Sequence, residues 1–551
     1  MKYKVTLKDI QVGDVASEPA ILILAGGSVN EKLRHLGIRA QSPALLPVHT
    51  RPLVAHVMDF YLEHTRGQIW LAVQKEHAAQ IQAELVQYRG RFDLLELPKT
   101  TGVVQTLSLT LAALPAEVEN CIVNLVTSIP TAVPEIGEIL LGGECGKHAP
   151  VAAIALGEKG ISFFFKDEPR PATARPFTGM FGLSKQALVE SCGQAERTDD
   201  LIAVLKRAPV SWRTREVTWI DCGHEVNFYA ARAQLIASRS FNRLVVEPEG
   251  GIVRKRSTAC QKLADEAAYL QALPTPVAIY FPRLVAPLTR HEGTAEYAME
   301  YYGYPNVAEY LLYWDLSPAL WHRMFEQFAA VLRKLAFEKR TLSQDEMEQF
   351  YVLRPAERIE QFLAGRTKSD VLLGLAAGKV RVNGQAVRPL DDLLRDAQRI
   401  VLGGDATANG GIMHGDFCFN NLLYDVASGI VRLIDPRGSF GGTRGIYGDT
   451  RYDLAKLMHS AVGQYDIIVN GLFEVRAAAG DLNYAVGERP ASAACAEAML
   501  EMLAELGADE RVCRVLMGLL FVTMPPLHME NHNRQLVFFA HGLRTLTNAL
   551  T

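Results

Sequence analysis

The segment GIMHGDFCFNNLLYD, residues 411–425, holds several polar side chains inside an apolar frame. They belong to His414, Asp416, Asn420 and Asn421. Burying an unpaired carboxylate is strongly unfavourable, so a buried set of this kind needs internal partners or a chemical task. The segment therefore predicts a fold in which a polar loop borders a hydrophobic core.

A second carboxylate follows along the chain. The apolar run VRLID predicts a strand that delivers Asp435 into a Pro/Gly turn, nineteen residues after Asp416. The intervening LLYDVASGIVRLI predicts a β-hairpin, which would bring the two carboxylates together. Phosphoryl transfer needs a carboxylate to accept a hydroxyl proton, oxygen ligands for Mg²⁺ and a cation on the nucleotide phosphates. Asp416, Asn421 and Asp435 are suited to the first two tasks, whereas an isolated HGD would form only a turn with an Asx hydrogen bond.

The order and spacing of these motifs resemble the aminoglycoside phosphotransferase and choline kinase family, whose fold is that of the protein kinases. The resemblance extends over residues 239–551 and implies an α+β phosphotransferase domain there. It implies a catalytic base at Asp416, metal ligands at Asn421 and Asp435, and support of the site by His414 and Asp453. His414 is expected to hydrogen-bond the loop backbone, since no second histidine lies at metal-ligand spacing.

Upstream motifs would supply the remaining parts that the resemblance implies. GGIVRKRST would provide the phosphate-contacting Lys255 from a hairpin strand, and Glu266 in the following helix would orient it. AMEYYGY lies where the family binds adenine, so backbone groups near Glu300 and Tyr301 would meet the base. The chain has PEGG before Lys255 and no Gly-x-Gly-x-x-Gly loop.

Two of these positions have alternatives. Arg254 and Arg256 flank Lys255, and a basic strand is often only a solvated face. Asp265 competes with Glu266, because helical phase alone does not choose between them, although EAAYL fits the family better.

Two further features bear on the acceptor. The arginines of DPRGSFGGTRG, Arg437 and Arg444, would either contact an anionic substrate or lie in solvent. The aromatic and acidic segment EYLLYWDL, residues 309–316, suits a cationic head group such as choline, and it suits ordinary packing equally well.

The first 238 residues alternate between strand-like and helix-like segments, which predicts a doubly wound, Rossmann-like α/β domain with a parallel sheet. AILILAGG is a buried strand that ends in Gly26 and Gly27. The run LILAGGSVNEKLRHLGIRAQSPALLPVHTRPL resembles the opening of the sugar nucleotidyltransferase family, and WIDCGHEVNFYAARAQL resembles its late metal-binding segment with Asp221. Backbone N–H groups at the glycine turn would still hold a phosphate.

The N-terminal half departs from that family where its chemistry lies. The family's Pro-Lys is replaced by Ser42-Pro43, so the catalytic lysine is missing; Lys32 would stand in for an arginine. NLVTSIPT offers only Thr127 and Ser128 where a metal aspartate is expected. The resemblance therefore implies a domain with a degenerate catalytic motif, which would retain a phosphate pocket or serve as a scaffold.

Bulk properties narrow the partners. The chain has 551 residues, too many for one core. A net charge of −4 and a pI near 6.4 argue against a nucleic-acid surface. The chain has no apolar run long enough for a membrane span and no signal-peptide core at its start. Its eight scattered cysteines are typical of reduced thiols in a cytoplasmic protein and give no zinc pattern.

The leading hypothesis is a small-molecule kinase that uses ATP and Mg²⁺, a phosphotransferase with an alcohol group as acceptor. The acceptor would be a sugar, a polyol or an amino alcohol, and the pairing of two module types implies, by analogy, surface-polysaccharide precursor synthesis. One alternative is a bifunctional kinase and nucleotidyltransferase, with a second nucleotide or a sugar phosphate in the N-terminal domain. Another is a catalytically silent nucleotide-binding protein. The sequence sets neither the acceptor nor the oligomeric state.

Overall fold

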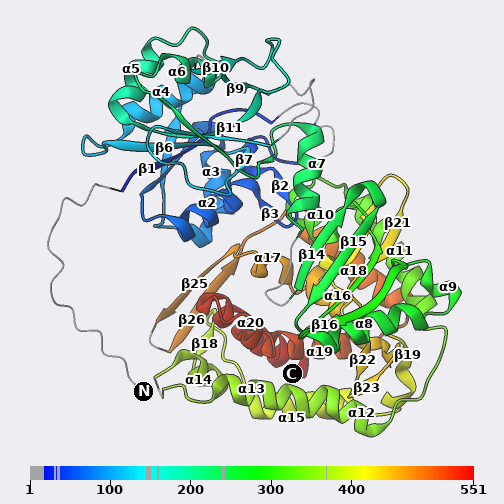
Figure 1. Cartoon of the computed structure of the whole chain (residues 1–551). Helices are drawn as coiled ribbons and strands as arrows, with labels where there is room; N and C mark the ends of the chain where they lie inside the picture. Colours follow the sequence, from blue (N-terminus) through cyan, green and yellow to red (C-terminus); the bar gives the residue numbers. More distant parts are fainter. Residues whose placement is uncertain are drawn as a thin grey trace.

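The computed structural model describes residues 18–29, 33, 38–143, 151–157, 160–236, 242–367, 369–478 and 480–551. Figure 1 shows an N-terminal part built around a large sheet and a C-terminal part that is mostly helical and carries a second sheet. The predicted boundary between residues 238 and 239 lies outside the described residues, so it stays a prediction.

One large sheet forms the centre of the N-terminal part. Its strands are β1 (Ala20–Ala25), β4 (Ile69–Gln74), β5 (Asp93–Leu97), β6 (Asn120–Leu125), β8 (Glu138–Leu141), β9 (Ala153–Gly157), β10 (Gly160–Phe164), β11 (Arg175–Ser184) and β12 (Arg213–Glu216). Their order is β10-β9-β11-β6-β1-β4-β5, with β8 also paired to β11 and β12 to β8. β6, β1, β4 and β5 are parallel, whereas β11 runs antiparallel to β6. The α/β class is confirmed, and the sheet is mixed where the sequence predicted a parallel one.

Helices cover both faces of this sheet. They are α2 (Leu53–His64), α3 (Lys75–Glu84), α4 (Val103–Ala113), α5 (Lys185–Gly193) and α6 (Ile202–Arg207). Ile21 and Ile23 of β1 join a core with residues of α2 and α3, and Leu22 and Leu24 join a second core with residues of α4 to α6. Successive side chains of a strand point to opposite faces. A continuous apolar run such as AILILA is therefore what a strand covered on both sides requires.

The C-terminal part begins with a four-stranded antiparallel sheet. Its strands are β14 (Asn242–Glu247), β15 (Ile252–Ser257), β16 (Leu284–His291) and β17 (Thr294–Glu300), in the order β14-β15-β17-β16. The helix α8 (Cys260–Ala272) packs on it through Leu263 and Ala267. The predicted hairpin that carries Lys255 is present over Asn242–Ser257 in the described residues, and so is the predicted helix with Glu266.

A helical body follows, with one large hydrophobic core. Its main helices are α10 (Val307–Tyr313), α11 (Pro318–Leu335), α13 (Arg354–Leu363), α15 (Leu390–Val401), α16 (Thr450–Ala461), α18 (Ser492–Glu505), α19 (Glu510–Val522) and α20 (His532–Leu550). The Ser317 hydroxyl accepts from the N–H of Leu320 and caps α11, as its sequence predicts. Beyond α18, Gly507 has a φ of 63°, a left-handed conformation that favours glycine.

The two parts contact each other through the segment that follows β17. Trp314 forms a β-bridge with Ile38 and packs against an N-terminal core, while the N–H of Arg39 donates to the carbonyl of Tyr313. Glu309 is 1% exposed and lies 2.7 Å from Arg232 of α7 (Glu225–Gln234). Ordinary packing between the parts therefore accounts for the aromatic and acidic segment 309–316.

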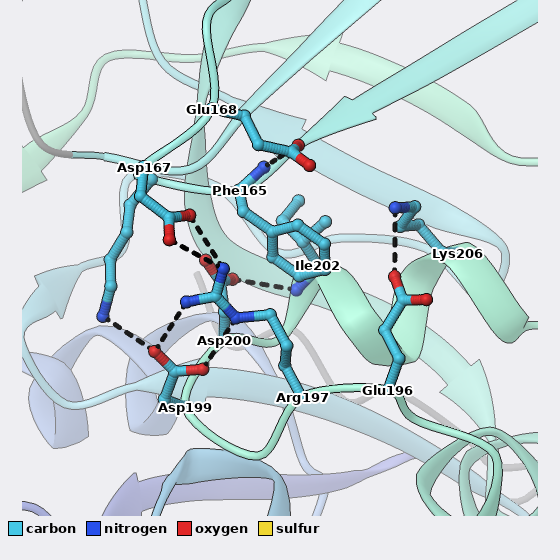
Figure 2. A network of polar contacts seen from close by, with 10 residues as sticks. Phe165, Asp167, Glu168, Glu196, Arg197, Asp199, Asp200, Ile202 and Lys206 are labelled. Carbon is cyan, nitrogen blue, oxygen red and sulfur yellow. Dashed lines mark hydrogen bonds and ion pairs between the residues drawn. The ribbon is translucent and has the colours of Figure 1, made fainter.

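A polar network on the N-terminal part fixes a surface turn beside α6 (Figure 2). Arg197 bonds Asp167 and Asp199, while Lys206 bonds Glu196. The Arg197 guanidinium lies 4.7 Å from the centre of the Phe165 ring, and the Lys206 ammonium lies 4.6 Å from it. Because most of these charges face solvent, the network orders the turn more than it adds stability.

Among the described residues, no helix combines the length and the apolar character that a bilayer crossing demands. None of the described cysteines forms a disulfide bond.

The contact between the two parts generates a stability prediction. Arg489 donates to both carboxylate oxygens of Glu84 at 2.6 and 2.9 Å, and the two side chains are 8% and 4% exposed. Glu84→Gln should lower the free energy of unfolding by about 3–5 kcal/mol, because it leaves the Arg489 charge buried without its partner. Chemical denaturation followed by circular dichroism measures the loss.

A matched control crosses the same interface. Arg89 and Glu474 form an ion pair at 2.9 Å whose side chains are 68% and 43% exposed. Arg89→Ala should change the free energy of unfolding by no more than about 1 kcal/mol, since solvent screens this pair. Equal losses from Glu84→Gln and Arg89→Ala would show that burial does not set the strength of these pairs.

Candidate active site

The polar loop of residues 413–421 joins β19 (Gly410–Ile412) to β20 (Leu422–Asp425), which pairs with β21 (Ile430–Leu433) as the predicted hairpin. Phe417 and Phe419 anchor the loop, because both are fully buried against rings of α11. Asp416 lies beside them with its side chain 23% exposed. The apolar frame therefore fixes the loop while leaving one carboxylate accessible.

Asp453 of α16 holds the backbone of this loop. Its two carboxylate oxygens accept the N–H groups of His414 and Gly415, each at 2.7 Å. Burial raises the pKa of Asp453 to about 7, and the two backbone hydrogen bonds oppose that rise. Asp453 thus holds the backbone of the loop that carries Asp416, and its role in a functional site stays a prediction.

His414 ties the loop to the strand that precedes Asp435. Its Nδ1 accepts the N–H of Asp416 at 3.2 Å, so the proton lies on Nε2, which donates to the carbonyl of Ile434 at 3.0 Å. Burial lowers the pKa of His414 to about 4, which keeps the ring neutral. This agrees with the predicted backbone-bonding role.

The Asp416 carboxylate has two close partners. Asn421 Nδ2 donates to Asp416 Oδ2 at 2.9 Å, and the Lys456 ammonium lies 2.7 Å from Asp416 Oδ1. Burial alone would lower the pKa of Lys456, but the Asp416 charge raises it above its usual value. Lys456 was missed from the sequence. A signal existed, because Lys456 follows Asp453 by three residues and so lies on the same helical face.

The remaining polar residue of the loop has a structural partner. Asn420 Nδ2 donates to Asp466 Oδ1 at 2.7 Å, at the start of α17 (Tyr465–Val469). Asp466 is fully buried, and burial raises its pKa to about 7. Asn420 therefore secures the loop against the helical body and is not turned toward Asp416.

Lys255, Glu266 and Asp435 meet, although they come from three separate segments. The Lys255 ammonium lies 2.7 Å from both Glu266 oxygens and 2.8 Å from Asp435 Oδ1. Burial would lower the pKa of Lys255, and the charges of Asp435 and Glu266 raise it instead. Tyr297 also donates its hydroxyl to Glu266 at 2.5 Å. The buried ammonium is therefore fully charged and held rigidly.

The structure decides between Glu266 and Asp265. Asp265 lies 3.2 Å from Arg444 and accepts from Gln261, on the side of α8 away from Lys255. Asp435 itself has a φ of 59°, an uncommon conformation for a residue other than glycine. Such backbone strain is concentrated at functional sites, where surrounding contacts hold it in place.

The predicted adenine-contacting segment follows β17. The N–H of Glu300 donates to the carbonyl of Arg283, and the N–H of Tyr301 donates to the carbonyl of Gly251. The Glu300 carboxylate pairs with Arg283 and accepts the Tyr302 hydroxyl. These two amides already donate to the carbonyls of Arg283 and Gly251, and a contact between the base and backbone groups near Glu300 and Tyr301 stays a prediction.

Asn421 and Asp435 carry oxygen donors of the kind that Mg²⁺ prefers, and binding of the ion by this pair stays a prediction. They offer an amide oxygen and a carboxylate 42% exposed to solvent, and hard oxygen ligands suit this ion. Within the described residues, no three His, Cys, Asp or Glu side chains are grouped to hold a metal. A site with one carboxylate is typical of an ion that also binds substrate phosphates.

In the N-terminal part, the residues that the sequence singled out make contacts within the protein. Gly26 approaches Thr106 so closely that a Cβ there would lie 2.7 Å from the threonine Oγ1, and the Gly26 carbonyl accepts from Gln74. The Asp221 carboxylate accepts from the N–H of Gly223, and bonds His224 and Asn227 at the start of α7. Asp221 therefore orders a helix start.

Of three other positions that the sequence singled out in this part, two make hydrogen bonds within the protein and one lies outside the described residues. Ser42 accepts from the Ala44 N–H, and Ser128 donates to the carbonyl of Thr178. Lys32 lies outside the described residues. Phosphate binding at Gly26 and Gly27 stays a prediction.

Comparison with known proteins finds similarity of fold. No family model and no curated protein matches the sequence. The N-terminal part is similar to the inositol-1-phosphate CTP transferase from T. maritima (13% identity, 40% of this chain and 99% of that chain, TM-score 0.34).

The C-terminal part is similar to aminoglycoside phosphotransferases. One is APH(3″)-Id from Streptomyces rimosus (15% identity, 56% of this chain and 91% of that chain, TM-score 0.32). Another is APH(2″)-IIia, solved with GDP and kanamycin (15% identity, 57% of this chain and 91% of that chain, TM-score 0.37). The two parts thus have neighbours in the two classes that the sequence resembles, and these likenesses assign no activity.

The Asp416–Lys456 pair generates a prediction about stability. Lys456 is 8% exposed, so Asp416→Asn, which leaves its charge without a carboxylate, should lower the free energy of unfolding by about 3–5 kcal/mol. Lys456→Met should be less damaging, because Asp416 keeps Asn421 and reaches solvent. The double variant should regain most of the loss. Urea denaturation tests this, and losses that simply add in the double variant would refute the coupling.

Proposed function

We propose that residues 239–551 form a kinase domain that transfers the γ-phosphoryl group of ATP to a hydroxyl group, with Mg²⁺ as the metal. The supporting observation is the convergence at Asp435: Lys255, held by Glu266, lies 2.8 Å from its carboxylate, and the same hairpin joins it to Asp416 and Asn421. These are the parts that phosphoryl transfer requires. The acceptor would be a small hydroxyl compound for surface-polysaccharide precursors.

The chemistry assigns one role to each side chain. The acceptor oxygen attacks the γ-phosphorus, the bond from that phosphorus to the bridging oxygen breaks, and ADP leaves. The hydroxyl proton passes to an oxygen of Asp416, whose carboxylate Lys456 and Asn421 hold in position. Lys255 places its fixed charge on the nucleotide phosphates. Mg²⁺, when bound by Asn421 and Asp435, adds positive charge to the phosphate oxygens.

The first experiment measures Mg²⁺-dependent transfer from ATP into a pooled library of sugars, polyols, hydroxy acids and amino alcohols, with products detected by mass spectrometry. Asp416→Asn should reduce turnover by about 10²–10⁴-fold, the usual contribution of a positioned general base. The double variant D416N/K456M, expected to fold more stably than Asp416→Asn, should be equally inactive.

The matched control is Asp425→Asn. Asp425 lies in the same hairpin, but its carboxylate accepts from Ser428 in an exposed turn, so its loss should leave turnover unchanged. A product that forms equally well with Asp416→Asn would disprove the proposed base. No product from any acceptor, with ATP still bound, would support the silent nucleotide-binding alternative.

The N-terminal part is assigned no nucleotidyl transfer in this proposal, which sets aside the bifunctional alternative. The three hydrogen bonds to the Asp221 carboxylate and its place at a helix start support this assignment. Incubation of the protein with CTP, UTP, GTP or ATP and a panel of sugar phosphates should release no pyrophosphate above background. Release that disappears with Asp221→Asn would restore the bifunctional alternative.

A further inference from the structure

One arginine, Arg437, lies beside the catalytic loop and packs against two aromatic rings. Arg437 follows Asp435 by two residues and packs against Gly415, where a Cβ would lie 2.6 Å from that of Arg437. The Arg437 guanidinium lies 5.0 Å from the centre of the Phe350 ring and 5.2 Å from that of Tyr452, whose hydroxyl accepts from it at 3.3 Å. Among the described residues, no carboxylate forms an ion pair with this guanidinium. Burial alone would lower the pKa of Arg437, while Tyr452 and the more distant charges of Asp416 and Asp453 raise it.

A second arginine, Arg358 of α13, lies near enough to Arg437 for the two charges to interact. Partial burial lowers the pKa of Arg358, and the positive charge of Arg437 lowers it further. In the part of the chain that the structure describes, Arg358 likewise forms no ion pair with an acid. Two like charges held together by the fold repel each other, and an anion between them would relieve that repulsion.

A cavity of about 340 Å³ opens at Arg358. This volume is in the range of small-molecule sites. The lining is apolar and cationic, with no carboxylate among its residues, which include Arg358, Gln361, Phe362, Arg366, Pro526 and Met529. Arg366 is oriented there by its own ion pair with Asp370 at 2.9 Å. A cationic compound would find no counter-charge in this lining.

From this geometry we propose that the acceptor is an anion: a hydroxyl compound that also carries a phosphate or a carboxylate group. The anionic group would bind between Arg358 and Arg437, and the hydroxyl would face Asp416, next to Gly415. The inference rests on the proposed kinase function and narrows its acceptor class. It removes amino alcohols such as choline from the acceptors that the sequence left open.

The test uses matched acceptors that differ in charge. Glycerol is compared with glycerate and glycerol 3-phosphate, and glucose with glucuronate and glucose 1-phosphate, in the full-length protein with Mg²⁺ and ATP. At least one anionic compound should exceed its neutral counterpart by tenfold or more in kcat/KM. The phosphate and carboxylate members of each set then identify which anion the site takes.

The variant Arg358→Gln keeps the helix and the length of the polar side chain while removing the charge. It should raise KM for the preferred anionic acceptor about tenfold or more, the loss expected for one charged hydrogen bond, and affect kcat and the neutral acceptors much less. The control is Arg395→Gln on α15, whose side chain is 63% exposed and which should change neither constant. Circular dichroism confirms that both variants fold.

A binding measurement separates failure of this inference from failure of the kinase. Isothermal titration of each acceptor is carried out with the wild type and with Arg358→Gln, without ATP. If an anionic acceptor binds and Arg358→Gln weakens it tenfold while no acceptor is phosphorylated, the anion site stands and the kinase function fails. If neutral and anionic compounds react and bind alike, or no anionic compound binds, or Arg358→Gln has no effect, the anion site is wrong.

Discussion

The arrangement of the C-terminal part depends on one buried ammonium group. Lys255 comes from the four-stranded sheet, Glu266 from the helix packed on it, and Asp435 from the segment that follows the β20–β21 hairpin. Removing an ammonium from water is unfavourable by several kcal/mol, and two carboxylates offset this only at close range and good geometry. Gly438 allows the approach, since a Cβ there would lie 2.4 Å from the Asp265 carbonyl oxygen. The sheet, the helix and the hairpin are thereby fixed to one another at the point where a nucleotide would bind.

The N-terminal part contacts the same region from the other side. Ile38 contacts Trp314 and Arg232 pairs with Glu309, and both partners lie in the segment after β17. Glu84 pairs with Arg489 in the loop before α18. Buried pairs of this kind fix register, because a displaced partner leaves a charge in an apolar environment. The N-terminal part therefore fixes the position of Glu309 and Trp314, which follow the predicted base-contacting residues Glu300 and Tyr301 along the chain.

Several features were predictable from sequence because local chemistry determines them. The AILILA strand, the capped helix after Ser317 and the hairpin before Asp435 each follow from an apolar period with a recognisable start or turn. The pair of Asp416 and Asn421 followed from spacing within one loop. Lys456 was missed because its partner lies 40 residues away, and only the packing of α16 brings them together. The choice of Glu266 over Asp265 and the antiparallel β11 likewise depend on tertiary contacts that no single segment encodes.

The need to balance charge links the proposed kinase function of the C-terminal part to its proposed anionic acceptor. An acceptor that carries its own negative charge must approach a triphosphate, and in a site of low dielectric this repulsion would be severe without local cations. The chain provides cations on both sides of Asp416: Lys456 at 2.7 Å, and Arg437 against the preceding glycine. Arginine suits the second position, since a planar guanidinium can rest on the Phe350 and Tyr452 rings and still present donors to an oxyanion. For the same electrostatic reason a cationic acceptor would need an acidic lining. The cavity beside α13 is lined mostly by arginines and apolar residues instead.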